Sequence, residues 1–539
     1  MYWIIVFTLD KHGILRKYNI SAYFGLLLVI RTMRGQKFLD KLATPKGFWR
    51  IFANLGVPLM LISMVSMFLI FIYLVYLIIV YSPSNLSQES LGETIRMSLF
   101  IPGINPFLPF VWGWIALIVT LIVHEFAHAI LCKVEGIRVK SMGILYAIIP
   151  LGGFAEPDEE QLFGVEKTNK KVATRKEKIR ILTAGVMANF VVAFIALALF
   201  FGPVLSAIAP VGEVMVMKVT ENSPAEHSGI KENMVITQIN ETQIKNANDF
   251  LIALSKVKPG SNITVHAADE GKKMKKVFEV QTIKDESDIN GVRVKEVVEG
   301  SPAEKVGFKK GMIITAMDDT KINDLGDFIN FMNTTHADDD IKVRVLTNDS
   351  INATSVIFNV KLAKHPLENK GFLGVSYDIE NIANRLTGIE IGVFPATQQI
   401  NTLKNIPSML SGLEGWFHIF MLAIEFRGFS GILLPFYEPT GWATSLGIGI
   451  FWIANSLLWI GWVNFYVGLF NCLPGFYLPS IKIRFDGGHF FKDIVNSLLE
   501  KFMSNKEKTE KISDTIVNAS AFLILFSLIF MIVGPYILY

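Results

Sequence analysis

Hydrophobic residues in this chain gather into five long runs that are separated by polar segments. Each run approaches or exceeds the roughly 20 apolar residues that an α-helix needs to cross a bilayer. The runs cover residues 57–81, 108–131, 179–201, 446–470 and 515–539. The pattern predicts five membrane-spanning helices, with a long region of soluble character between the third and the fourth.

The composition narrows the class of protein. Hydrophobic residues make up 51% of the 539 residues and charged residues only 18%, and the mean hydropathy is +0.41. A water-soluble domain is less apolar than this, so we expect an integral membrane protein surrounded by the lipid bilayer. The net charge of +3 is too small to hold a nucleic acid, and nucleic-acid binding is therefore excluded.

Lysine and arginine residues are concentrated in three segments, and this bias predicts the orientation of the chain. The three segments precede the first run, separate the second run from the third, and separate the fourth from the fifth. Because basic residues near span ends mark the cytoplasmic side, we expect these segments to be cytoplasmic and residues 203–445 to be extracytoplasmic.

Shorter apolar stretches do not fit a full crossing. We interpret residues 1–9 as a short buried or interfacial anchor, and residues 416–426 and 431–436 as interfacial, because Glu425 and Pro435 interrupt the latter two. Residues 144–154 end in Gly152 and Gly153 and predict a re-entrant hairpin, since irregular backbone at membrane depth must be covered by protein.

The polar region repeats itself. The sequence Ser-Pro-Ala-Glu at 223–226 returns 78 residues later at 301–304. Downstream positions match in the same register, among them Gly229 with Gly307, Met234 with Met312, and Phe250 with Phe328. Each copy predicts a strand, a helix begun by proline, a glycine turn, another strand and a second helix, so we infer two copies of one α+β domain at 211–284 and 289–364.

These copies resemble the PDZ domain in the form found in bacterial and archaeal proteases. The resemblance implies that each binds an extended peptide beside an exposed strand. A role only in filling space or holding subunits together stays open, because a fold does not fix a function. The rest of the chain then divides into an N-terminal membrane part (1–202), an extracytoplasmic or interfacial linker (365–445) and a C-terminal membrane part (446–539).

Candidate chemistry lies in the second apolar run, which contains the pattern His-Glu-x-x-His at 124–128. Residues four apart lie on one face of a helix, so His124 and His128 can hold one zinc ion while Glu125 reaches a water molecule. Ionisable residues are costly to bury in a membrane and usually mark a functional site. A helix pair held together by polar contacts is the alternative interpretation.

A catalytic zinc needs a third protein ligand and an open position. Asp486 follows the fourth run and lies on the same predicted side of the membrane, so we expect it to be the third ligand. His489 is the alternative, but a carboxylate completes the two-histidine pattern common in hydrolytic zinc sites. Cys132 and Cys472 are interpreted as small buried residues without a metal role.

The chain resembles the site-2 protease family of intramembrane zinc metalloproteases over most of its length. The matching residues are His-Glu-x-x-His at 124–128, Gly185 with Asn189, the Pro-Leu-Gly-Gly-Phe sequence at 150–154, Asn471 with Pro474, and Asp486-Gly487. The segment between Pro474 and Asp486 is longer than usual for the family, and Val186 occupies a position that is commonly proline.

The resemblance implies a polytopic α-helical membrane protein with two inserted α+β PDZ-like domains. It implies that His124, His128 and Asp486 bind Zn²⁺, that Glu125 is catalytic, and that Asn189 and Asn471 handle substrate. Gly152 and Gly153 are a further candidate edge for an extended substrate. The expected reaction is cleavage of single-span membrane proteins within their transmembrane segments, with the PDZ-like domains controlling access. The active site is expected toward the cytoplasmic side.

Two functions from other classes stay open. One is a non-catalytic membrane scaffold or chaperone that binds peptides through its PDZ-like domains, and the other is a metal transporter. Neither needs a general base such as Glu125 beside two metal ligands, so both are the weaker interpretations. Substrate identity and oligomeric state are not readable from the sequence.

Overall fold

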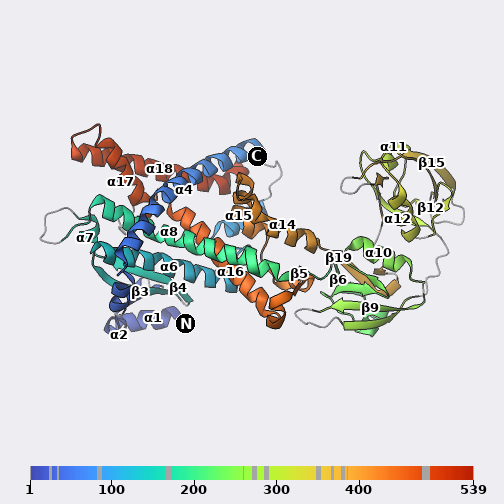
Figure 1. Cartoon of the computed structure of the whole chain (residues 1–539), viewed down its shortest axis with the longest axis horizontal. Coiled ribbons are helices and arrows are strands. Elements are labelled where there is room, and N and C mark those ends of the chain that lie inside the picture. Colours follow the sequence, from blue (N-terminus) through green and yellow to red (C-terminus); the bar gives the residue numbers. More distant parts are fainter. Residues whose placement is uncertain are drawn as a thin grey trace. The chain divides into compact units, whose positions relative to one another are not determined.

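In the computed structural model, the residues described are 2–23, 27–32, 35–81, 88–147, 149–164, 171–258, 260–269, 276–283, 291–323, 325–347, 354–365, 370–377, 383–384, 386–475 and 486–537. They form two compact units (Figure 1). The first comprises Met1–Pro203, Ile406–Gly428 and Trp452–Tyr539. The second comprises Val204–Asn405 and Phe429–Phe451.

The five predicted spans are confirmed: the described part of the chain contains five helices long and apolar enough to cross a membrane. They are α4 (Lys46–Tyr81), α6 (Phe110–Glu135), α8 (Arg175–Leu199), α16 (Gly449–Asn471) and α18 (Lys506–Ile537). A short π-helical turn, Phe200–Val204, extends α8. The protein is therefore a multi-pass membrane protein.

Helix α8 contacts α4, α6 and α16, and these contacts give the helix directions (Figure 1). Asn189 and Ile181 of α8 bond His124 and His128 of α6 in reverse order, so those two helices are antiparallel. Gly461 and Gly468 of α16 likewise meet Leu197 and Asn189 in reverse order, whereas Ala53 and Gly56 of α4 meet α8 in parallel. The directions of these four helices alternate along the chain, as the basic segments predict.

Shorter helices complete the first unit. They are α1 (Tyr2–Lys11), α2 (Ile14–Lys17), α3 (Gln36–Leu42), α5 (Gln88–Ser98), α7 (Glu159–Phe163), α15 (Leu413–Glu425) and α17 (Asp486–Leu499). Helix α1 has ten residues, which at about 1.5 Å per residue is too short to span a bilayer. The interfacial position expected for residues 416–426 stays a prediction; most of them lie in α15.

A four-stranded antiparallel sheet packs against α6 in the first unit. Its order is β1 (Ile20–Tyr23), β2 (Leu27–Thr32), β3 (Val139–Ala147) and β4 (Ile149–Pro157). The expected hairpin at 144–154 is present as β3 and β4, in which Ile144 pairs with Gly153. The sequence did not predict that an N-terminal hairpin, β1 and β2, extends this sheet. Strand β4 forms its last edge, and no other described strand pairs with that edge.

The second unit contains two sheets of the same topology, which bears out the sequence repeat. The first sheet has the order β10-β9-β7-β6-β19, with β8 paired to β7. Its strands are β6 (Val214–Val219), β7 (Val235–Ile239), β8 (Thr242–Gln243), β9 (Asn262–Ala268), β10 (Lys276–Gln281) and β19 (Ile389–Val393), and its helices are α9 (Pro224–Ser228) and α10 (Ala247–Ser255).

The second sheet has the order β15-β14-β12-β11-β18, with β13 paired to β12. Its strands are β11 (Val292–Val297), β12 (Ile313–Met317), β13 (Thr320–Lys321), β14 (Asp340–Leu346), β15 (Ser355–Lys361) and β18 (Val375–Tyr377), and its helices are α11 (Pro302–Val306) and α12 (Leu325–Thr334). Ser223 and Ser301 cap α9 and α11 alike, by accepting a hydrogen bond from the backbone N–H three residues later. The two copies therefore share their local structure as well as their strand order.

The second copy is inserted into the first, before its last strand. Gly388, which precedes β19, lies so close to Ser223 that a Cβ there would be 2.1 Å from the serine Cβ, and Gly374, which precedes β18, has the same approach to Ser301. Strands β19 and β18 are thus equivalent, yet β18 comes first in the chain. Residues 365–445, expected to be a linker, therefore supply a strand to each sheet.

The remaining elements of the second unit follow these sheets or flank them. Two short pairs are β16 (Ala363–Lys364) with β17 (Gly371–Phe372), and β5 (Ile208–Pro210) with β20 (Tyr437–Pro439). Helix α14 (Ala396–Met409) and the 3₁₀ turns Gly431–Phe436 and Gly441–Leu446 come later in the chain. Leu251 of α10 is 1% exposed and packs in the core of the second copy, so the two copies share a buried contact.

Candidate metal centre

The two histidines lie one turn apart on α6, in the half of the helix nearer its C-terminal end. An apolar helix of this length satisfies its own backbone hydrogen bonds. Because residues four apart lie on the same face of a helix, the side chains at 124 and 128 project from one face. Their Nε2 atoms are 3.1 Å apart. Both imidazoles therefore direct their Nε2 atoms toward one point.

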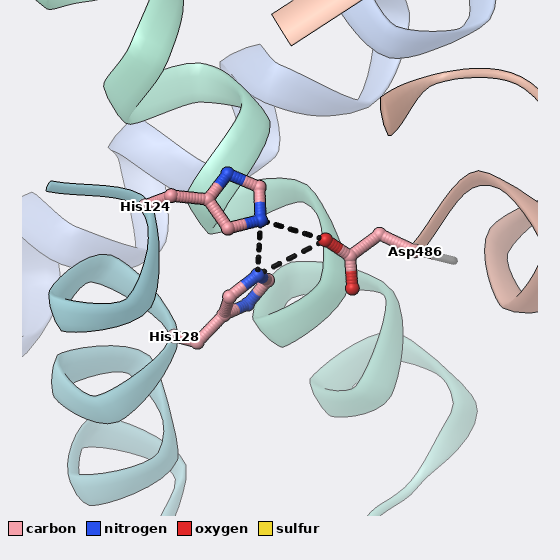
Figure 2. Close-up of side chains that lie close together, drawn as sticks. All are labelled: His124, His128 and Asp486. Atoms are coloured by element: carbon pink, nitrogen blue, oxygen red, sulfur yellow. Dashed lines mark hydrogen bonds and ion pairs between the residues drawn. The ribbon is translucent and has the colours of Figure 1, made fainter. Parts of the chain in front are cut away.

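Asp486, the first residue of α17, completes the group (Figure 2). Its Oδ2 atom is 3.1 Å from Nε2 of His124 and 3.0 Å from Nε2 of His128. Asp486 follows His124 by 362 positions and His128 by 358 positions in the sequence, and the three residues come from two helices. Among the described residues, these three form the candidate metal-binding group, as the sequence predicted.

Helix α8 holds the far nitrogens of both rings. Nδ1–H of His128 donates to the backbone carbonyl of Ile181 at 2.7 Å. The Nδ1 atom of His124 lies 3.1 Å from the amide of Asn189, a fully buried residue whose Oδ1 has no hydrogen-bond partner. A rotation of the Asn189 amide by half a turn exchanges its nitrogen and oxygen. With the oxygen facing His124, the amide accepts a hydrogen bond from Nδ1–H of that histidine. Both histidines are then fixed with Nε2 free to bind a metal.

Gly185 of α8 makes room for this group. A Cβ at that position would lie 2.4 Å from Nε2 of His128 and 2.8 Å from Nε2 of His124. Such distances do not occur between real atoms, so a residue with a side chain would displace the two rings. The absence of a side chain at 185 is therefore part of the site.

The residues fit a zinc ion. Four-coordinate zinc takes nitrogen and carboxylate ligands at about 2.0–2.2 Å, which places tetrahedral ligand atoms roughly 3.3 Å apart. The three atoms here are 3.0–3.1 Å apart. Two histidines and one carboxylate also leave one position open, as hydrolytic zinc sites require.

Glu125 lies between α6 and the sheet edge. Its Oε2 accepts a hydrogen bond of 3.2 Å from the backbone N–H of Ala155 in β4. The side chain is one residue from His124 and does not join the group of three. Strand β4 also carries Gly152 and Gly153, so the structure brings the glycine pair and Glu125 to the same part of the first unit.

The other candidate residues lie outside the group of three. Asn471 is the last residue of α16 and is half-buried. His489 stacks on Phe163 of α7 with a centroid distance of 4.4 Å and is not part of the metal-binding group. Cys132 and Cys472 are buried, and Cys472 donates to the carbonyl of Gly468 at 3.2 Å.

A comparison with protein families decides the class of this site. The model for Peptidase family M50 matches residues 112–526, which include all three metal-binding candidates and most of the chain. The chain belongs to peptidase family M50. The resemblance to site-2 proteases is confirmed at the level of this family.

Relatives of this M50 peptidase come from all three domains of life. An uncharacterized protein of Methanocaldococcus jannaschii is 29% identical over 46% of this chain and 60% of its own length. A Clostridium perfringens protein named "Putative zinc metalloprotease" is 26% identical over 37% of this chain and 62% of its own. The chloroplastic membrane metalloprotease ARASP of Arabidopsis thaliana is 29% identical over 28% of this chain and 39% of its own. The chain spans at most about three fifths of the curated relatives it matches.

Two contributors to the M50 site carried no signal in the sequence. Ile181 acts through its backbone carbonyl, which every residue type possesses. Ala155 likewise meets Glu125 through its backbone N–H. Only the positions of α8 and β4 relative to α6 bring these groups to the histidines and to Glu125.

Proposed function

We propose that this M50 peptidase is an intramembrane zinc metalloprotease that cleaves the transmembrane segments of single-span membrane proteins. One observation carries the proposal: two histidines of a membrane-spanning helix and an aspartate present three ligand atoms within 3.1 Å of one another, with a glutamate beside them. Ionisable groups grouped at such a depth are characteristic of function.

The chemistry follows from this arrangement. A zinc ion held by His124, His128 and Asp486 would supply a Lewis acid for water and for the scissile carbonyl. Glu125 takes a proton from the attacking water and later returns it to the leaving amine. The carbonyl of Ile181 and the amide of Asn189 keep both imidazoles in the orientation that presents Nε2. We thus assign to Asn189 a positioning role in place of the expected substrate contact.

Strand β4 is suited to hold a substrate. A transmembrane helix has its carbonyls engaged in its own hydrogen bonds and must unwind before cleavage. The edge of β4 with which no other described strand pairs offers backbone groups to an unwound chain, and Gly152 and Gly153 lie on this strand. The hydrogen bond from Ala155 places the Glu125 carboxylate beside the same strand. A substrate extended along β4 is therefore delivered to the general base.

The metal is tested by removal and by substitution. Protein purified in detergent should hold one zinc, lose cleavage of a single-span substrate on chelation, and regain it when zinc is returned. Asp486→Ala should lose zinc because the carboxylate supplies one of the three ligands, whereas His489→Ala should keep it. Metal analysis of the two variants is the measurement. Full zinc in Asp486→Ala together with loss in His489→Ala would overturn the ligand assignment.

We further propose that the two copies in the second unit are extracytoplasmic PDZ-like domains that control which substrates reach the zinc. Bulky extracytoplasmic domains can reject proteins with large ectodomains, and a peptide groove can favour newly exposed ends. The segment between the third and fourth spans is expected outside the cytoplasm because basic residues gather on the other side.

Because the second copy is nested in the first, a single deletion can remove both copies and so test this proposal. Val214 of β6 pairs with Val393 of β19, so the chain enters and leaves the two copies at adjacent positions. Replacing residues 214–393 by a short glycine-serine bridge removes both copies completely. The deleted protein should hold zinc and cleave untrimmed substrates that the full chain rejects. Unchanged preference for trimmed substrates, or no cleavage by a folded zinc-loaded protein, would contradict the proposed control of access.

A further inference from the structure

Two ion pairs join α8 to α17 and to Glu500, the residue that follows α17. Lys178 Nζ lies 2.8 Å from Asp493 Oδ1. Arg175 forms two hydrogen bonds with Glu500, at 2.8 and 2.7 Å. Both pairs connect the helix that supports the histidines to the segment that begins with Asp486.

The spacing of these residues links the ion pairs to the metal centre. Lys178 precedes Gly185 by seven residues on α8, and Asp493 follows Asp486 by seven residues on α17. Seven residues are close to two helical turns, so each pair of positions lies on one stripe of its helix, about 10.5 Å apart. Gly185 faces the His124 and His128 nitrogens that Asp486 meets. The contact between Lys178 and Asp493 therefore places Asp486 beside Gly185.

The two ion pairs differ in burial. The Asp493 side chain is only 6% exposed and that of Lys178 is 23% exposed, whereas the Arg175 and Glu500 side chains are 38% and 41% exposed. Oδ2 of Asp493 has no other hydrogen-bond partner among the described residues. A buried carboxylate depends strongly on the cation that hydrogen-bonds it, here Lys178, while an exposed pair contributes little. Lys178–Asp493 is thus the pair that fixes the register.

The contacts of α17 with α18 do not supply this constraint. Lys492 pairs with Asp514 of α18, and Ser513 donates to the carbonyl of Lys492. These contacts hold α17 against α18, whereas α17 meets α8 through the Lys178 contact and through the packing of Phe490 with Val186. At its start, Gly487 lies against the carbonyls of Cys472 and Leu473, with room for no side chain.

We infer that the buried Lys178–Asp493 ion pair is a positioning device for the third metal ligand. It sets the axial register of α17 against α8, and a slip of one turn would move Asp486 by about 5.4 Å, beyond the reach of the histidines. The inference rests on the proposed zinc site and assigns to it two residues outside the family's metal-binding motif.

Zinc affinity measured by competition with a chelator, on the full chain in detergent, tests this inference. Asp493→Asn and Lys178→Met should each weaken zinc binding about 10- to 100-fold, the range found when groups supporting metal ligands are removed. Lys178→Arg keeps the cation and should bind zinc much as the unmodified protein does. The matched controls are Glu500→Gln, in the exposed pair that Arg175 forms just after the end of α17, and Arg180→Gln, which weakens a contact of α8 with Glu135 that does not involve α17.

A second variant keeps the test decisive if a lone buried charge impairs folding. Lys178→Met combined with Asp493→Leu replaces the pair by apolar side chains, a change that buried ion pairs often tolerate without loss of stability. This variant should unfold at the temperature of the zinc-free parent and still bind zinc weakly. Parental zinc affinity in the double variant, or in both single variants, would overturn the inference. Absence of zinc from the parent and from Arg180→Gln would instead refute the proposed zinc site.

Discussion

Glu125→Gln should reduce cleavage of a single-span substrate by about 100- to 10,000-fold, the usual contribution of a general acid–base residue. Glutamine has nearly the same shape, and its amide oxygen can still accept the hydrogen bond from the Ala155 N–H. What it loses is the ability to take a proton from water. Because Glu125 is not among the three ligands, zinc content should not change. Single-turnover cleavage and metal analysis on the same preparation measure both effects.

The matched control is Glu156→Gln, which removes a carboxylate on the same strand one residue beyond Ala155. Glu156 accepts a hydrogen bond from Ser141 at 2.6 Å, lies 3.7 Å from Arg31 of β2, and has a side chain that is 44% exposed. Its variant should retain both cleavage and zinc. Cleavage by Glu125→Gln at the parental rate would refute the assignment of the general base, and loss of zinc would show that Glu125 acts as a ligand.

The membrane helices and the two inserted copies were predictable because each leaves a strong local pattern. The spans need long apolar runs, and the helix caps at Ser223 and Ser301 need the same short sequence in both copies. The His-Glu-x-x-His pattern likewise places two ligands by helix geometry alone. Asp486 was harder, since its pairing with α6 bridges more than 350 positions. It was predicted from its expected side of the membrane and from the carboxylate that two-histidine zinc sites commonly use, and the resemblance then supported it.

The nested order of the copies and the support of the histidines had no such pattern. Strands β18 and β19 are three and five residues long and follow segments that differ between the copies, so the bounds predicted from the repeat end before them. Helix α8 acts on the site through a backbone carbonyl, an amide and a missing side chain. These depend on the packing of α8 against α6, a tertiary contact that periodicity does not encode.

Adding a side chain at position 185 gives the most localised test of the site. Gly185→Ala should reduce zinc affinity by about 100-fold, because the new Cβ would lie 2.4 Å from a ligand atom of His128. The backbone of α8 has little room to retreat, since Thr183 donates to the carbonyl of Ala53 and Gly56 of α4 packs against it.

The change in the free energy of unfolding distinguishes a loss of zinc binding from a general loss of stability. Alanine favours a helix over glycine by about 1 kcal/mol, so helix propensity alone would stabilise the variant. The control is Gly468→Ala on α16, where a Cβ would meet Phe190 of the same helix α8 at an ordinary 3.4 Å. That variant should bind zinc as the parent does. If Gly185→Ala also binds zinc with parental affinity, the two imidazoles do not occupy the space beside α8, and the metal centre derived from His124, His128 and Asp486 is wrong.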